Sequence, residues 1–301
     1  MAEFFPSFLP PEVKLLKEPA AIALAQNIKR QPIATQLHPQ PIATSFVHQG
    51  SGGTPILLLH GFDSSVLEFR RLIPLLAAHS ETWGVDLLGF GFTERIQGIS
   101  FNPDTIKTHL YYFWKTLIDR PVILVGTSMG GATAIDFTFT HPHAVAKLVL
   151  INSVGFSGDF PLGRFLFPPL DYLAVEYWRQ RKLQALFLSE IGNLEPGIIE
   201  AIRCAVLHLQ MPSWHEAMID FTKSGGYSNL VNKIAQIHKP TLILWGEADD
   251  TLDKGDAVKF KEAIAGSQLI WLKNCGHVPH LEQPEIIAEY LLTCPKNLNV
   301  K

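Results

Sequence analysis

Short runs of Val, Ile and Leu alternate with helical patterns along most of this chain, and the alternation restricts the folds that it can adopt. Strands of this composition, each followed by a helix, are typical of a mostly parallel sheet that helices cover on both faces. The predicted strands lie at 42–49, 55–62, 81–91, 121–126, 146–155, 240–250 and 267–277. The predicted helices lie at 65–78, 103–118, 129–140, 254–265 and 283–293. We therefore predict an α/β fold with a mostly parallel central sheet.

The alternation breaks in the second half of the chain, and the break defines the expected domain organisation. Residues 156–235 contain helical stretches and large apolar or aromatic residues but no convincing buried strand. We expect this region to be a helical lid inserted into a core of residues 41–155 and 236–301. The proline-punctuated residues 1–40 are expected to form an N-terminal arm with one helical piece around 12–29. Acidic residues offset the basic ones in that piece, which favours packing over contact with a lipid surface.

A tight glycine-rich turn follows the strand predicted at 121–126. Its sequence, Gly-Thr-Ser-Met-Gly, fits the G-x-S-x-G pattern that places a serine on a sharp turn between a strand and a helix. Gly126 and Gly130 avoid collisions that side chains would make with the strand and the helix. The hydroxyl of Ser128 would project above the sheet, and Met129 would begin a helix whose N-terminus favours negative charge. A loop that only closes a strand–helix unit is the alternative.

A serine hydroxyl is a weak nucleophile, so it needs a general base and an acid that orients the base. Asp249 and Asp250 end the strand predicted at 240–250. His277 ends the next predicted strand, and His280 follows three residues later. The order Ser, Asp, His along the chain is the one expected for a serine on this kind of turn. The pattern itself leaves open which aspartate and which histidine act.

Five stretches together resemble the α/β-hydrolase superfamily, from about residue 42 to the C-terminus. They are LLLHGF (57–62), DLLGFG (86–91), VGTSMGG (125–131), LWGEADD (244–250) and NCGHVPHLEQPE (274–285). The resemblance implies that Ser128 is the nucleophile, His277 the general base and Asp249 the orienting acid. The family pattern W-G-x-x-D selects Asp249 over Asp250, and the family's G-H-x-x-H ending selects His277 over His280.

The same resemblance implies an oxyanion hole made by the backbone N–H groups of Phe62 and Met129. Each donor of this kind typically stabilises the transition state by about 3 kcal/mol. His60 is interpreted as a histidine that braces the loop, not as a second base. No metal or organic cofactor is expected to take part.

Composition and charge narrow the expected partners and location. With 25 basic and 28 acidic residues the formal charge is −3, which argues against a dedicated nucleic-acid binder. Cys204, Cys275 and Cys294 are too few and too scattered for a disulfide framework, so we expect a reducing, cytoplasmic location. We expect a small-molecule acyl substrate and a monomer or homodimer. Peripheral lipid contact through the arm or the lid stays open.

The serine predicts an acyl-enzyme and leaves several reactions open. Hydrolysis of a hydrophobic ester or acyl lipid is expected, because the lid stretch FPLGRFLFPPLDYLAVEYW (160–178) could line an apolar pocket. The turn also resembles that of meta-cleavage product hydrolases, which break a carbon–carbon bond. Those proteins usually have tryptophan after the catalytic histidine, where this chain has Val278, and a lid arginine that binds the substrate carboxylate. Carbon–carbon hydrolysis is therefore one alternative, and a non-catalytic ligand-binding protein of the same fold is another. The arginines available in the lid are Arg164, Arg179, Arg181 and Arg203.

Overall fold

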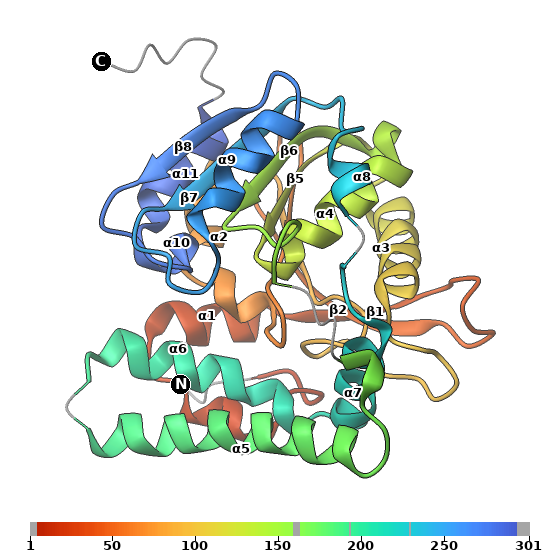
Figure 1. The fold of residues 1–301 in the computed structure, drawn as a ribbon. Helices are drawn as coiled ribbons and strands as arrows, with labels where there is room; N and C mark the ends of the chain where they lie inside the picture. The colour runs from red at the N-terminus through yellow and green to blue at the C-terminus, as the bar shows by residue number, and fades with distance from the viewer. Residues whose placement is uncertain (1–4, 159–162, 193, 229, 294–301) are drawn as a thin grey trace.

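A computed structural model of the chain describes residues 5–158, 163–192, 194–228 and 230–293. Cys294, residues 1–4 of the predicted arm and residues 159–162, 193 and 229 of the predicted lid lie outside these ranges. An eight-stranded sheet in the order β1-β2-β4-β3-β5-β6-β7-β8 forms the centre (Figure 1). Its strands are β1 (Lys29–Ile33), β2 (Ile42–Gln49), β3 (Ile56–Leu59), β4 (Thr82–Val85), β5 (Val122–Thr127), β6 (Val145–Ile151), β7 (Thr241–Gly246) and β8 (Gln268–Leu272). Strands β3 to β8 are parallel, whereas β2 pairs antiparallel with both β1 and β4, so the predicted mostly parallel sheet is confirmed.

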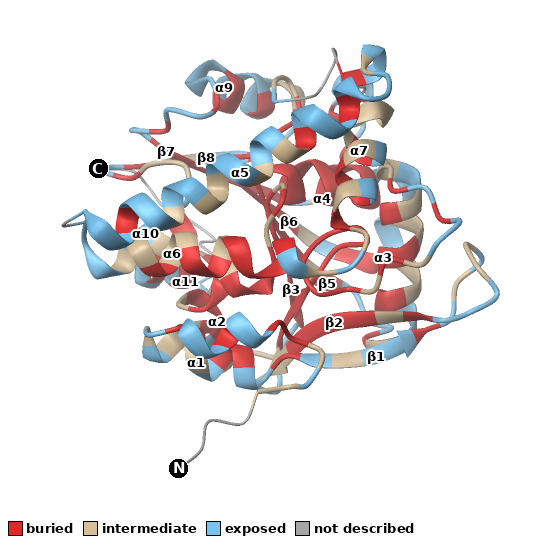
Figure 2. Ribbon diagram, turned by 90° about the horizontal axis from the view of Figure 1, so that it is seen from below, coloured by how far each residue is buried: buried red, intermediate tan, exposed pale blue. Residues whose placement is uncertain are grey.

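Helices cover both faces of the sheet. Successive residues of each central strand point to opposite faces, so each strand contributes apolar side chains to two hydrophobic clusters. Leu57 and Leu59 of β3 belong to the hydrophobic cluster that contains α3, α4 and α9. Ile56 and Leu58 belong to the cluster on the other face, which contains α1, α2 and α11. Figure 2 shows the central strands in red, as buried on both sides. The core helices are α1 (Pro19–Gln26), α2 (Leu72–Ala77), α3 (Pro103–Leu117), α4 (Met129–Thr140), α9 (Lys254–Ala263), α10 (Pro279–Glu282) and α11 (Pro284–Leu292).

Several local predictions differ from the structure. The strands predicted at 55–62, 146–155, 240–250 and 267–277 end earlier, at Leu59, Ile151, Gly246 and Leu272. The single helical piece predicted around 12–29 is instead a 3-10 turn, Pro11–Leu15, followed by α1. The helix predicted at 65–78 is a 3-10 turn, η2 (Val66–Phe69), followed by α2. The strand predicted at 81–91 ends at Val85, because the carboxylate of Asp86 holds the following loop by accepting from the N–H groups of Val66 and Phe92 at 2.7 and 2.8 Å. The strand β1 was not predicted: it is polar and contains Pro32, a residue that only an edge strand tolerates well.

Between β6 and β7 the described residues form helices and loops without a strand. We call this segment the helical insertion. Its elements are η4 (Gly163–Phe165), α5 (Leu170–Ile191), α6 (Pro196–Leu207), η5 (His208–Gln210), α7 (Trp214–Ser224) and α8 (Val231–Ile234). Figure 1 shows its helices α5, α6 and α7 below the sheet, whereas its last helix, α8, lies beside α4. This is the region in which the sequence predicts a helical lid.

The N-terminal arm packs between the core and the helical insertion. Besides α1 it contains a 3-10 turn, η1 (Pro11–Leu15). The Glu18 carboxylate accepts from Arg70 at 2.8 Å and from Arg71 at 2.6 Å, both of the core. Glu200 of α6 in turn accepts from the backbone N–H of Lys17 at 2.7 Å. These contacts agree with the interpretation of the arm as a packing element. In the part of the chain that the structure describes, no helix is both long and apolar enough to cross a membrane.

Candidate active site

Ser128 lies on the sharp turn between β5 and α4, with φ 51° and ψ −120°. A non-glycine residue rarely adopts a positive φ, and such strain is typical of functional sites. The two glycines make the turn sterically possible. A Cβ on Gly126 would lie 2.2 Å from the carbonyl oxygen of Gly130, and one on Gly130 would lie 2.2 Å from that of Leu59. The backbone N–H of Ser128 donates to the carbonyl of Ile151 on β6 at 3.0 Å, which ties the turn to the sheet.

A continuous chain of hydrogen bonds joins Ser128, His277 and Asp249. Nε2 of His277 lies 3.1 Å from Oγ of Ser128, and its Nδ1 lies 3.0 and 3.1 Å from the two carboxylate oxygens of Asp249. The two neighbours come from loops that follow β7 and β8, so parallel strands bring all three to one edge of the sheet. With Nδ1–H donating to the carboxylate, Nε2 is free to accept the serine proton.

The structure also distinguishes the competing residues. Asp249 is buried, and its Oδ1 additionally accepts from the backbone N–H groups of Thr251 and Leu252 at 2.8 and 3.2 Å. Asp250 is exposed and bonds only to the hydroxyl of Thr251 among the described residues. His280 is buried behind His277, and burial lowers its pKa to about 3. The geometry therefore joins Ser128 to the aspartate and histidine that the family resemblance selects.

The loop after β3 passes beside the serine. A Cβ on Gly61 would lie 3.5 Å from Cβ of Ser128, which places the adjoining Phe62 next to the turn. Glu68 holds this loop by accepting from the N–H of Gly61 at 3.1 Å and from the hydroxyl of Thr127 at 2.6 Å. Met129 is the first residue of α4, where backbone N–H groups lack partners within the helix. The two expected oxyanion donors thus flank Ser128 on separate segments.

His60 braces the same loop as a neutral side chain. The N–H of Leu87 donates to its Nε2 at 3.1 Å, so Nδ1 carries the proton and donates to the carbonyl of Gly61 at 2.8 Å. Burial lowers the pKa of His60 to about 4. Protonation of Nε2 would therefore break the bond to Leu87.

We predict that His60 makes the protein sensitive to acid. The unfolded chain binds a proton near the ordinary histidine pKa of 6.5, whereas the folded chain does so only near pH 4. As the pH falls through this window the wild type should lose stability relative to His60→Gln, by up to about 1.4 kcal/mol per pH unit. Denaturant unfolding of both proteins at several pH values measures the difference. His143→Gln, at an exposed site, is the control; a pH-independent difference for His60→Gln would contradict the assignment.

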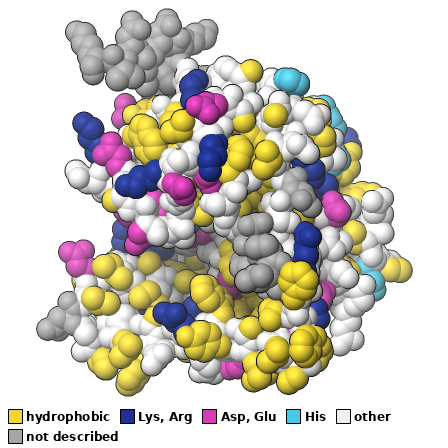
Figure 3. Space-filling view, viewed as in Figure 1, with side chains coloured by type: hydrophobic (Ala, Val, Ile, Leu, Met, Phe, Trp, Pro, Cys, Tyr) yellow, Lys and Arg dark blue, Asp and Glu magenta, His cyan; other side chains and the backbone are white. Residues whose placement is uncertain are grey.

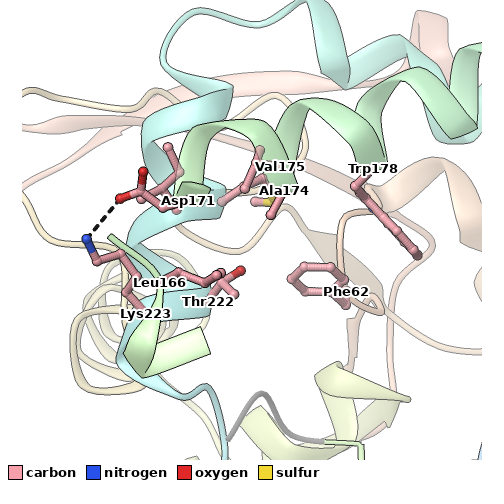
Figure 4. A pocket seen from close by; sticks show the side chains of 10 residues that line it. Phe62, Leu166, Asp171, Ala174, Val175, Trp178, Thr222 and Lys223 are labelled. Atoms are coloured by element: carbon pink, nitrogen blue, oxygen red, sulfur yellow. Dashed lines mark hydrogen bonds and ion pairs between the residues drawn. The ribbon is translucent and has the colours of Figure 1, made fainter. Parts of the chain in front are cut away.

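A cavity of about 230 Å³ opens between the helical insertion and Phe62. Apolar side chains dominate its wall: Phe62, Leu166, Val175, Trp178, Met218 and Ile219. Figure 4 shows Phe62 and Trp178 at one end and an ion pair between Asp171 and Lys223 at the other; its oxygen and nitrogen atoms are 3.0 Å apart. Ser128 and His277 are not among the described lining residues; Phe62, whose loop passes beside Ser128, links the cavity to the serine. The one cation among the described lining residues, Lys223, is paired with Asp171.

Asp63 is a buried, charged residue next to the candidate site that the sequence analysis missed. It follows Phe62 directly, has φ 48°, and is fully enclosed by the helical insertion. Trp178, Trp214 and His208 donate to its carboxylate at 3.0, 2.9 and 2.7 Å, and the Lys182 ammonium lies at 2.6 Å. Burial acts to raise the pKa of Asp63, but Lys182 and His208 outweigh it and hold the pKa well below its ordinary value. No local motif marks this residue, because all four partners lie more than a hundred positions away.

Cys275 lies close to His277 in the chain but is not an activated thiol. It is buried, and mainly because of this burial its pKa is raised to about 12. Thiolates, not thiols, are the nucleophilic form, so Cys275 is inert at neutral pH. Among the residues that the structure describes, no group of three or more His, Cys, Asp and Glu side chains is placed to hold a metal ion.

Comparisons with known proteins agree with this architecture. Residues 56–290 match the model of the alpha/beta hydrolase family. The chain is 38% identical over 295 residues to the alpha/beta hydrolase domain-containing protein VTE7 of Arabidopsis thaliana, covering 95% of this chain and 89% of that protein. It is 30% identical over 255 residues to the 2-hydroxy-6-oxo-2,4-heptadienoate hydrolase of Pseudomonas putida, covering 79% of this chain and 87% of that enzyme.

A solved structure supports the fold in the same way. An esterase from Thermogutta terrifontis superposes with a TM-score of 0.72 at 23% identity, over 87% of this chain and 96% of the esterase. At that identity the likeness concerns the fold alone. The family model and the two relatives also establish family membership, since they match most of the sequence. This chain is a member of the α/β-hydrolase family, and it is a hydrolase by that membership.

Proposed function

We propose that this protein is a serine hydrolase that cleaves esters with a hydrophobic acyl or alcohol group. The observation that carries the proposal is the hydrogen-bonded series Ser128, His277 and Asp249 beside an apolar cavity. The cavity offers no unpaired cation among its described lining residues, because Lys223 is bound to Asp171. Such a wall favours an uncharged, apolar substrate over a carboxylate.

The geometry supports a two-step reaction. Nε2 of His277 accepts the proton as Oγ of Ser128 attacks the acyl carbon, and the carboxylate of Asp249 stabilises the imidazolium that forms. The backbone N–H groups of Phe62 and Met129 would hold the oxyanion. The imidazolium then gives its proton to the leaving alcohol, which departs and leaves an ester on Ser128. Water, deprotonated by His277, attacks that ester and releases the acid and the free serine.

Carbon–carbon bond hydrolysis is a second candidate, favoured by the 30% identity to the Pseudomonas putida enzyme. The name of that enzyme's substrate specifies a carboxylate, which calls for a cationic partner. Four arginines of the helical insertion were candidates for this role, and none of them lines the described cavity. Three have polar partners: Arg164 contacts Ser228, Arg179 contacts Glu176, and Arg203 contacts Glu190 and Glu200, while Arg181 is exposed. We therefore rank the ester reaction first.

Labelling with a fluorophosphonate probe tests the proposal. The wild type should react and Ser128→Ala should not, because only an activated serine attacks the phosphorus. A series of p-nitrophenyl esters and the dienoate substrate of the relative should then be compared at equal enzyme concentration. Preferred turnover of medium or long acyl esters supports the proposal, and preferred turnover of the dienoate supports the second candidate. A folded protein that neither reacts nor turns over would indicate a non-catalytic ligand-binding protein.

The cavity makes a separate prediction about chain length. Ala174 lines it from α5, so Ala174→Trp should fill part of it and move the optimum of the ester series to shorter chains. We expect kcat/KM for long chains to fall about tenfold or more, as overpacking a site costs about 1–3 kcal/mol, whereas the value for acetate esters should hold. Leu173→Trp is the control, since its side chain is on the same helix but is not among the described residues that line the cavity. An unchanged optimum in Ala174→Trp would show that the acyl chain binds elsewhere.

A further inference from the structure

The outward face of α5 is hydrophobic and exposed. This 22-residue helix buries Asp171, Val175 and Ser189 against the rest of the molecule. Its opposite side follows the 3.6-residue helical repeat and exposes large apolar side chains at both ends of the helix, with the polar residues Gln180, Arg181 and Gln184 between them. We call this surface the outer face; it consists of Leu170, Leu173, Tyr177, Phe187, Leu188 and Ile191, which are 47 to 66% exposed. Figure 2, seen from below, shows α5 largely in pale blue. Figure 3 shows hydrophobic side chains along the lower edge of the molecule, which is where α5 lies in Figure 1.

Two further aromatic residues extend this surface beyond the helix. Phe165 and Phe167, just before α5, are 76% and 62% exposed. Single exposed hydrophobic residues are ordinary on a protein surface, but a group such as Phe165 and Phe167 together with the apolar residues of the first two turns of α5 marks an interaction site. Tyr177, within the outer face, combines an apolar ring with a polar hydroxyl, the type of side chain enriched at membrane–water interfaces. The feature that needs an explanation is therefore a helix that is apolar toward solvent.

The charges of α5 are arranged to keep carboxylates away from the outer face. Its three acidic residues are all engaged by basic partners: Asp171 by Lys223, Glu176 by Arg179 and His215, and Glu190 by Arg203. Arg181, in contrast, is exposed and has no polar partner among the described residues. Although the whole chain has a formal charge of −3, this face presents apolar groups with a cation at its border. That combination suits an anionic or zwitterionic lipid headgroup layer.

We propose that the outer face of α5, together with Phe165 and Phe167, docks the protein on the surface of a lipid bilayer. The position of the cavity favours a bilayer over a second copy of the chain. Ala174 and Trp178 line the cavity and are themselves exposed, so the cavity opens alongside the docking helix. A second copy seated there would cover the opening. A bilayer would instead present hydrophobic substrate to it.

Delivery of substrate from the bilayer rests on the proposed function, but docking itself does not. Vesicle binding can be measured with the Ser128→Ala protein, which needs no activity. A failure of the proposed function would therefore appear in the labelling assay alone, and a failure of docking in the vesicle assay alone. The arm is not part of this surface, since it packs between the core and α6.

Flotation with phosphatidylcholine vesicles, with and without phosphatidylglycerol, tests the proposal on the full chain. The wild type should bind both, more tightly to the anionic ones at low salt. Tyr177→Glu with Leu188→Glu should weaken binding about a hundredfold or more, because two large apolar side chains are lost from the contact and two charges are added. Val258→Glu with Ile286→Glu is the matched control: these residues are also exposed hydrophobics, on α9 and α11, and their replacement should leave binding unchanged.

Hydrolysis of a short soluble ester should be the same in all three proteins, which confirms that each is folded. Light scattering of the free proteins completes the test. A wild type that does not bind vesicles, or a Tyr177→Glu, Leu188→Glu protein that binds like the wild type, overturns the proposal. So does a wild-type dimer that this variant separates, because the outer face would then join two copies.

Discussion

Replacing Ser128 by alanine should reduce kcat for ester hydrolysis by about 10⁴- to 10⁶-fold. The hydroxyl is the one group within reach of Nε2 of His277 that can form an ester with the acyl carbon, so its loss removes the acyl-enzyme altogether. The residual rate would come from the oxyanion donors and substrate binding. Steady-state kinetics and fluorophosphonate labelling measure the effect.

A neighbouring serine is a matched control for this experiment. Ser153 is buried beside the turn, but its hydroxyl donates to the carbonyl of Val154 at 2.9 Å and makes no contact with His277. Ser153→Ala should keep full labelling. Turnover that survives in Ser128→Ala would require another nucleophile and would refute the proposed mechanism.

The same assay separates the two adjacent aspartates. Asp249→Asn should lower kcat by about 10⁴-fold, because an amide at this position favours the wrong tautomer of His277. Asp250→Asn should change kcat little, since its exposed carboxylate does not contact the imidazole. A small loss in Asp249→Asn that becomes large when Asp250→Asn is added would show that Asp250 can replace Asp249.

Replacing Asp63 by asparagine should both destabilise the protein and slow catalysis. The substitution removes the counter-charge of the Lys182 ammonium and turns one of two accepting oxygens into a donor that faces other donors. Breaking a buried ion pair in this way costs about 3–5 kcal/mol of unfolding free energy. Because the carboxylate ionises below its ordinary pKa of 3.8, its contribution is complete at neutral pH and is lost only in strong acid.

The catalytic effect follows from the position of Asp63 next to Phe62. Its carboxylate binds α5, η5 and α7 at once, so it positions both the helical insertion and the loop that carries an oxyanion donor. We expect kcat to fall about tenfold to a hundredfold at a temperature where the variant is folded, with a smaller change in KM. Kinetics at 25 °C and denaturant unfolding measure the two effects separately.

Two further variants test the cause. Lys182→Met keeps most of the apolar stem and removes the charge, so the double variant with Asp63→Asn should be more stable than the two single losses predict. Glu176→Gln is the control, because Glu176 also bonds several side chains of the insertion but makes no contact with the oxyanion loop. Its stability should change by less than about 1 kcal/mol. A kcat for Asp63→Asn equal to that of the wild type would make Asp63 purely structural.

Local chemistry encodes the core strands and the turn at Ser128, so the sequence alone predicted both. The family resemblance then selected Asp249 and His277, which the structure places in contact with each other and with Ser128. Buried parallel strands require continuous apolar runs, and the tight turn at Ser128 requires Gly126 and Gly130, so each leaves a local signature. The edge strand β1 left none: it is polar, contains Pro32 and depends on its pairing with β2 and on contacts of Arg30 and Ile33 with distant segments. Its existence depends on a partner and not on its own residues.

Other properties came from the tertiary structure alone. The physical difference between Asp249 and Asp250 is an example: the family resemblance selects Asp249, but the two are chemically identical neighbours, and the fold is what buries one of them against His277. The enclosure of Asp63 and the exposure of the outer face of α5 are of the same kind. The sequence around Asp63 does not predict that its carboxylate will be buried, and the sequence of α5 does not predict which of its faces will be exposed. Burial in both cases depends on segments far away in the chain. Sequence alone therefore determined the sheet, the turn and the residue types of the site. The packing of the helical insertion decided the charge environment of Asp63, the shape of the cavity and the exposed surface of α5.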